Sequence, residues 1–192
     1  MLSLKDRIAL LESDLLAEPP RISVYRDFPF AILHYDPRDE WQVRREARLL
    51  AARLENAGKK VITVSMAELL WQAIEAAEGI DAVVALEKER GFEAAEEQVN
   101  CYLSDPDWCP LSDLVAERVA GLDPRTHVVF LVRAAAMAPS LYPLSRLLDE
   151  MHGRAEVPTV LFYPGSLEGV AGLRFMGIRQ REASSSYRVK VY

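Results

Sequence analysis

Four short apolar runs, separated by segments with helical periodicity, constrain the fold of this chain more than any other feature. The clearest run spans residues 157–163 and stops at Pro164 and Gly165. Runs of the same character occupy residues 28–35, 60–64 and 127–132. Short apolar runs rich in β-branched and aromatic residues are typical of buried strands, and strands that alternate with helices favour a parallel sheet. The pattern therefore predicts βαβ connections.

The segments between these runs place apolar residues at helical spacing. They predict helices over residues 4–16, 39–56, 66–77, 111–121 and 139–151. The apolar stripe of the second helix includes Trp41, which we expect in the core. Its other side carries Arg44, Arg45, Arg48 and Arg53, a basic face suited to phosphate, but interleaved glutamates favour a solvated face with ion pairs. Two further helices are expected at residues 82–90 and 92–103. Residues 81–122 therefore form a helical insert between the second and third strands.

The C-terminal third carries a glycine-rich stretch and a final alternating segment. Gly165, Gly169 and Gly172 follow the fourth strand and predict a loop, whereas residues 187–192 alternate and predict an edge strand. The sum is a single α/β domain over residues 1–192. It has three layers, α/β/α, with a mostly parallel sheet of about five strands, similar to nucleotide-binding domains but without a phosphate-binding loop.

Familiar catalytic and cofactor motifs are absent from the sequence. There is no G-x-x-x-x-G-K-[ST], no G-x-G-x-x-G at the first helix and no G-x-S-x-G. Two cysteines, Cys101 and Cys109, and three scattered histidines lack the spacing of metal ligands. We therefore expect no cofactor, no metal and no catalytic activity.

Charge is distributed unevenly along the chain. The formal net charge is −6, which argues against non-specific binding of nucleic acid by the whole surface. Residues 68–97 carry nine acidic and two basic side chains, whereas residues 125–192 carry nine basic and five acidic ones. Solvated helix faces explain this pattern, and a bipolar molecule that docks partners at both ends is the sharper alternative. Without a secretory leader or an apolar run long enough for a bilayer, we expect a cytoplasmic protein and no membrane association.

Ligands of parallel sheets bind outside the carboxyl ends of the strands. Those ends supply the following residues: His34, Tyr35, Asp36, Ser65, Arg133, Tyr163 and Gly165. They line a pocket or only cap strands and satisfy loop backbone groups, and the sequence leaves both open. The glycines after the fourth strand, with Arg174 beside them, are a weak candidate for an anion cradle.

Several segments resemble the BrxB family of the BREX (bacteriophage exclusion) defence systems. The most specific are VVFLVRAAAMAPSLYPLSRLLDEMHGR at residues 128–154 and VPTVLFYPGSLEG at residues 157–169. LRFMG, the terminal YRVKVY and the upstream FPFAILHYDP are also similar. The resemblance implies a small component of an anti-phage system that encodes an adenine-specific DNA methyltransferase, a large ATPase and an alkaline-phosphatase-like protein. These proteins are the partners that it implies.

The preferred hypothesis is a non-catalytic adaptor or assembly component. It predicts an exposed patch rich in arginine and tyrosine, and its candidate residues are Tyr142, Arg146, Tyr187, Arg188 and Tyr192. The alternative is a degenerate nucleotide- or nucleic-acid-binding module, with the candidate residues Arg133, Arg174, Arg179 and Arg181. A hydrolase that uses Asp36 or Glu168 is a third option. Self-association through residues 4–16 stays open.

Overall fold

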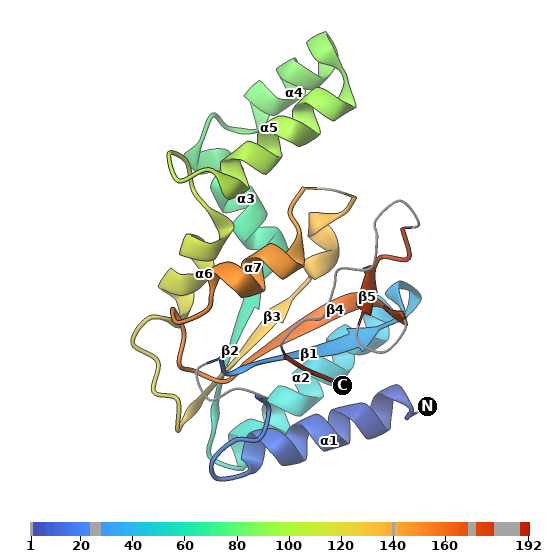
Figure 1. Cartoon of the computed structure of the whole chain (residues 1–192), viewed down its shortest axis with the longest axis vertical. Helices are drawn as coiled ribbons and strands as arrows, with labels where there is room; N and C mark the ends of the chain where they lie inside the picture. Colours follow the sequence, from blue (N-terminus) through green and yellow to red (C-terminus); the bar gives the residue numbers. More distant parts are fainter. Residues whose placement is uncertain (1, 24–27, 140, 169–171, 179–188) are drawn as a thin grey trace.

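The computed structural model describes residues 2–23, 28–139, 141–168, 172–178 and 189–192 (Figure 1). Its strands are β1 (Phe30–Tyr35), β2 (Lys60–Ser65), β3 (His127–Val132), β4 (Thr159–Glu168), β5 (Gly172–Phe175) and β6 (Lys190–Val191). Five of them form the order β2-β3-β4-β1-β6 with parallel neighbours. β5 pairs antiparallel with the far end of β4. The predicted α/β fold with a mostly parallel sheet is confirmed, with six strands.

Seven α-helices accompany the strands within the described residues. They are α1 (Leu4–Leu16), α2 (Glu40–Asn56), α3 (Met66–Ala76), α4 (Ile80–Arg90), α5 (Phe92–Ser104), α6 (Leu111–Val119) and α7 (Leu144–Glu150). Two short 3₁₀ helices are η1 (Pro37–Asp39) and η2 (Ala134–Met137). The predicted helix at residues 139–151 begins later, at Leu144, because residues from Ala134 first form η2 and Pro143 then occupies the N-cap.

Local capping explains several helix boundaries. The Ser3 hydroxyl accepts a hydrogen bond from the Asp6 amide, and the Asp6 carboxylate accepts one from the Ser3 amide, which makes a capping box at α1. The Ser65 hydroxyl accepts from the Glu68 amide at 3.3 Å and so starts α3 where β2 ends. After α2 the chain turns at Gly58, whose φ of +90° favours glycine.

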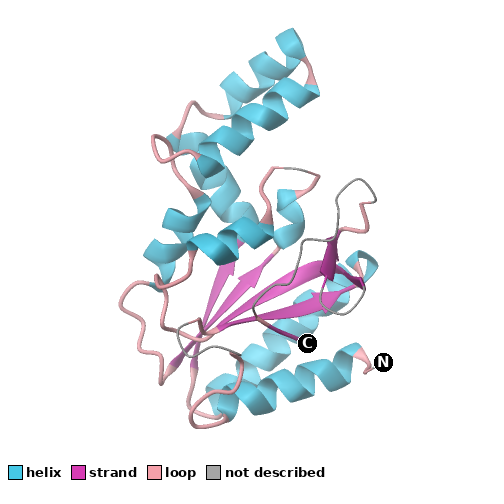
Figure 2. Cartoon of the chain, in the orientation of Figure 1, coloured by secondary structure: helices cyan, strands magenta, loops and turns pink. Residues whose placement is uncertain are grey.

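Helices cover both faces of the sheet, as Figure 2 shows. On one face α1 and α2 pack on alternate strand residues such as Leu33, Phe130 and Phe162. On the other face α3, α6 and α7 pack on the intervening residues, for example Leu131 and Leu161. The period of two along each strand therefore divides the apolar residues between two cores.

The predicted helical insert divides into two parts. α6 packs on the sheet, since its residues Leu111, Val115 and Val119 belong to the same core as α3 and α7. α4 and α5 form a helical hairpin that projects away from the sheet (Figure 1). They meet at Gly91, whose φ of +91° is suited to glycine.

The structure corrects the loop predicted after Tyr163 at Gly165 and Gly172, which lie in strands, whereas Gly169 lies outside the described residues. β4 continues through Pro164 and Gly165 to Glu168, and β5 returns antiparallel beside it. Gly165 pairs with Phe175 in this β-hairpin. Proline fits there because the Met176 amide donates to its carbonyl oxygen, a bond for which Pro164 needs no amide hydrogen.

Candidate functional site

A hollow of about 710 Å³ lies at the carboxyl ends of β1 and β4. Three of the predicted strand-end residues, His34, Asp36 and Gly165, line it together with Arg7 and Ser166. Parallel strands bring these ends to one edge of the sheet. The sequence therefore placed this cluster correctly, although its members come from segments about 130 residues apart in the chain.

Hydrogen bonds already engage three polar residues of this hollow, Arg7, His34 and Asp36. The Asp36 carboxylate accepts from the Arg38 amide at 2.9 Å and so caps η1. Arg7 donates to the backbone oxygens of His34 and Tyr192. Burial and the positive charge of Arg7 lower the pKa of His34, and a hydrogen bond with the Gly165 backbone offsets part of that shift. The imidazole is therefore neutral at pH 7.

Gly165 is required by packing rather than by a loop. A Cβ atom at this position would lie 2.2 Å from the Arg174 backbone oxygen and 2.6 Å from Cε1 of Tyr163. Only glycine lets β4 and β5 approach so closely, and the aromatic rings of Tyr163 and Phe175 meet beside it at 5.5 Å.

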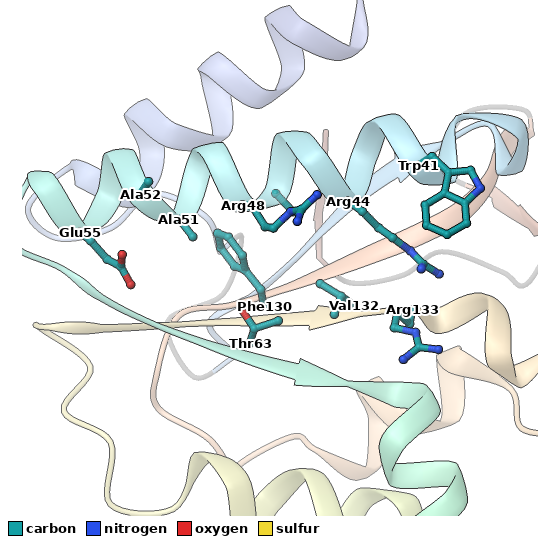
Figure 3. A pocket seen from close by; sticks show the side chains of 11 residues that line it. Trp41, Arg44, Arg48, Ala51, Ala52, Glu55, Thr63, Phe130, Val132 and Arg133 are labelled. Atoms are coloured by element: carbon teal, nitrogen blue, oxygen red, sulfur yellow. The ribbon is translucent and has the colours of Figure 1, made fainter.

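A second concave surface, a groove of about 460 Å³, lies between α2 and the β2–β3 edge of the sheet (Figure 3). We call it the α2 groove. Its apolar floor contains Phe130 and Val132 from β3 and Ala51 from α2. Arg44 and Arg133 point toward the same end of it, and Glu55 lies at the opposite end (Figure 3). Arg133 comes from the carboxyl end of β3, where it adopts a left-handed conformation with φ +60°.

Positive charge dominates one end of the α2 groove. Glu40 holds Arg44 through an Nε–Oε1 contact of 2.7 Å, while its other oxygen accepts from the Tyr35 hydroxyl. Arg44 also lies 4.7 Å above the ring of Trp41. Arg48 and Arg133 form no ion pair with a carboxylate in the described part of the chain. Two guanidinium groups are therefore available to an anion.

The α4–α5 hairpin offers a different surface. Residues 80–104 carry six acidic and two basic side chains. Phe92 at the tip is 56% exposed, and Val84 on α4 is 38% exposed. An acidic surface with exposed apolar side chains fits a partner protein better than a small anion.

Comparison with known families identifies the chain. A family model described as BREX protein BrxB matches residues 62–191, which is more than half of the chain. The chain belongs to the BrxB family of BREX proteins. It is therefore a component of BREX phage defence. Neither the curated proteins nor the solved structures gave a match.

The segment that matches the BrxB model includes the α4–α5 hairpin but only a minor part of the α2 groove. The α4–α5 hairpin and the C-terminal motifs lie inside it, whereas α1, β1 and most of the α2 groove lie before residue 62. The resemblance of FPFAILHYDP to BrxB proteins therefore falls outside the matched segment.

The structure overturns one part of the predicted interaction patch of this BrxB-family chain. Tyr142 is fully buried rather than exposed, and its hydroxyl donates to Oε2 of Glu150 at 2.6 Å. Burial and Glu150 raise the pKa of Tyr142. Arg146 is exposed, but its Nε contacts Oε1 of Glu150 at 2.5 Å and its terminal nitrogen donates to the Ser104 carbonyl. Tyr142 is a core residue, and Arg146 links α7 to the end of α5.

Tyr192 is also buried, so it does not form part of an exposed patch. Its hydroxyl donates to Oδ2 of Asp14 at 2.7 Å, and Lys190 contacts the same oxygen at 2.5 Å. Burial tends to raise the pKa of Asp14, but the hydrogen bonds from Lys190 and Tyr192 outweigh it and the pKa is lowered. Tyr187 and Arg188, the other two candidates, lie outside the described residues.

The arginines assigned to the alternative anion site do not share one environment. Arg133 lines the α2 groove, whereas Arg174 forms an ion pair with Glu168 across the β4–β5 hairpin. Arg179 and Arg181 lie outside the described residues. Tyr163, another candidate, is buried beside Phe175.

Sequence reasoning placed Arg44 and Arg48 on a basic helix face but preferred a solvated face with ion pairs, and it missed Trp41 as a site residue. The helical stripe predicted Trp41 in the core, but 77% of it is exposed. The available signal was the spacing of Trp41, Arg44 and Arg48 at i, i+3 and i+7, which places all three on one side of α2. Among the described residues there is no cluster of three metal-ligating side chains and no helix with the length and hydropathy to span a bilayer.

Proposed function

We propose that this BrxB-family chain is a non-catalytic adaptor that docks another BREX component through the α4–α5 hairpin. The observation that carries the proposal is the geometry of the hairpin, which projects from the body with its tip away from the sheet (Figure 1). A projecting element can reach into a partner without disturbing the core. Its role is then recognition rather than chemistry.

The chemistry of the hairpin indicates what kind of surface it fits. Phe92 supplies an exposed aromatic side chain of the type that anchors interfaces. Exposed Glu89 on α4 and Glu93 on α5 lie near it, together with the exposed Lys88 and Arg90, and the hairpin as a whole carries six acidic and two basic side chains. Charge complementarity favours a basic surface with an apolar pocket. The ATPase, the phosphatase-like protein and the methyltransferase of the system are the proteins to search for such a surface.

Co-purification from cells that carry the complete neighbouring gene set tests the proposal. We expect one BREX component to elute with the tagged chain in fixed proportion at two salt concentrations. Phe92→Ser combined with Glu93→Lys should remove that component. Leu10→Ser on α1 is the matched control, because Leu10 is an exposed apolar residue (44%) far from the hairpin in the chain. A tagged chain that elutes alone, or hairpin variants that retain the partner, would contradict the adaptor role.

The non-catalytic part of the proposal has its own test. The Asp36 carboxylate caps η1 and Glu168 pairs with Arg174, so both carboxylates have structural partners. We expect Asp36→Ala and Glu168→Ala to preserve phage defence, at a stability cost of about 1 kcal/mol or less each. Loss of defence by a variant that is still folded and still binds its partner would instead point to catalysis at that carboxylate.

A further inference from the structure

We infer that the α2 groove binds a free nucleoside phosphate. The groove differs from the α4–α5 hairpin in charge and shape, so this inference is independent of the adaptor proposal. Its volume of about 460 Å³ lies within the range of about 300–1,000 Å³ that is typical of small-molecule pockets. It also reaches the carboxyl end of β3, where ligands of parallel sheets bind.

The phosphate belongs at the arginine end of the groove. Arg44 from α2 and Arg133 from the end of β3 point toward that end, and Arg48 lines the groove one turn further along α2 (Figure 3). A planar guanidinium group donates two parallel hydrogen bonds to phosphate oxygens. Arg48 and Arg133 lack carboxylate partners among the described residues, so a phosphate can pair with them without breaking an existing ion pair. Arg133 adopts its left-handed conformation at this point, and such conformations concentrate at ligand sites.

The base belongs over the apolar floor. Val132 and Ala51 are half-buried and form, above the buried Phe130, an apolar surface that a planar ring covers. Glu55 at the opposite end presents a carboxylate, which accepts hydrogen bonds from the amino and ring N–H groups of a base. Trp41 stands exposed beside the arginines, where stacking against a sugar or base adds contact.

A single nucleotide fits this groove better than a nucleic-acid strand. A strand needs a continuous basic track along its phosphates. Here Arg44 and Arg133 lie at one end, Arg48 lies between the ends, and Glu55 places a negative charge at the other end. The net charge of the whole chain is −6, which further disfavours a polyanion.

Isothermal titration calorimetry of the purified full chain tests the inference. The ligands are GMP, AMP, guanosine, inorganic phosphate and a short single-stranded oligonucleotide. We expect GMP or AMP to bind, and Arg48→Gln and Arg133→Gly to weaken that binding by about tenfold or more. Glycine suits the positive φ of residue 133, so the second variant removes the guanidinium without adding strain. Arg45→Gln is the matched control, since Arg45 is exposed on α2 outside the groove.

Each outcome decides for or against the inference. Nucleotide binding that depends on Arg48 and Arg133 but not on Arg45 supports it. Equal affinity for inorganic phosphate and nucleotide would overturn it, because the apolar floor would then contribute nothing. So would binding of the oligonucleotide alone, or the absence of binding at millimolar nucleotide. Failure here leaves the co-purification result of the hairpin variants unaffected.

Discussion

The two faces of the sheet are covered to different degrees. On one face α3, α6 and α7 pack above β2 and β3, and Val64, Val129 and Leu131 are buried there. On the other face α1 and α2 are the only helices among the described residues, and Thr63 is exposed and Val132 half-buried there. The strands are the same, and the number of covering helices differs. The covered face serves stability, while the open face retains a concave surface that can serve binding.

The connections along the chain account for this difference. A single crossover, from β1 through α2 to β2, runs on the open face, and α1 lies beside it. The crossovers from β2 to β3 and from β3 to β4 carry their helices on the covered face. Within the described part of the chain, the β2–β3 edge therefore has no second helix above it on the α2 side.

The largest effect should come from a cavity on the covered face. Leu147 on α7 is fully buried in that core. Leu147→Ala should lower the free energy of unfolding by about 3–4 kcal/mol, because a cavity adds to the lost burial. Leu49→Ala on α2 is the control, since Leu49 is 44% exposed and should lose less than about 1 kcal/mol. Chemical denaturation measures the free energy of unfolding of both variants. Similar losses for Leu147→Ala and Leu49→Ala would contradict the difference in packing between the two faces.

Gly165→Ala should be the next most damaging change. The new Cβ atom meets backbone on one side and the Tyr163 ring on the other, so β4 and β5 must separate. We expect a loss of about 2–3 kcal/mol in the free energy of unfolding. Gly153→Ala is a useful comparison, because Gly153 has a positive φ but open space around its Cβ position, so it suffers only backbone strain. A smaller loss at Gly165 than at Gly153 would contradict the packing argument.

Asp14→Ala tests the contact that joins α1, on the open face, to the C-terminal residues Lys190 and Tyr192. The variant removes the acceptor of the buried Tyr192 hydroxyl and the carboxylate partner of Lys190, whose Nζ keeps only the Arg21 carbonyl oxygen at 3.4 Å, and this should cost about 2 kcal/mol. The pKa of Asp14 is lowered in the folded chain, so its contribution is present above the unfolded pKa of about 4 and is lost as pH falls through the folded pKa.

The pH dependence gives this prediction its control. Wild-type stability should fall more steeply than that of Asp14→Ala as pH is lowered below about 5. Asp14→Asn keeps an acceptor for Tyr192 and should lie between the two at neutral pH. Parallel pH profiles for wild type and Asp14→Ala would show that the carboxylate charge contributes nothing.

Much of this fold follows from local patterns in the sequence. The boundaries of α1 and β3 follow from the capping residue Ser3 and from the apolar run at residues 127–132. Gly58 and Ser65 mark helix ends for the same reason, because their conformations are decided by nearest neighbours. Such signals act within a few residues and are visible without tertiary information.

The sequence could not predict features that depend on which distant segment of the chain packs against a residue. Periodicity placed Trp41 on an apolar stripe, but a stripe is buried only where another layer lies opposite, and the open face ends there. The sequence favoured an exposed Tyr142 because nothing in it showed that the Glu150 carboxylate accepts a hydrogen bond from the Tyr142 hydroxyl. Gly165 suggested a loop since the close approach of β5 is a tertiary contact.

The smallest effect should come from filling the α2 groove. Ala51 is half-buried on α2 and borders the apolar floor. Ala51→Leu should raise the free energy of unfolding by about 0.5 kcal/mol, because the added methyl groups cover the half-buried Val132 in space that is now open. The same leucine occupies the position assigned to the base, so it should weaken nucleotide binding.

Gln42→Leu on α2 is the control for that change, since Gln42 is exposed and lies outside the groove. It should leave both the free energy of unfolding, within about 0.5 kcal/mol, and nucleotide affinity unchanged. Thermal denaturation and calorimetry on the same preparations measure the two quantities together. A destabilised Ala51→Leu would mean that the groove is already filled, and the two faces would then be equally packed. A stabilised Ala51→Leu with unchanged nucleotide affinity would show that the open face does not bind the nucleotide.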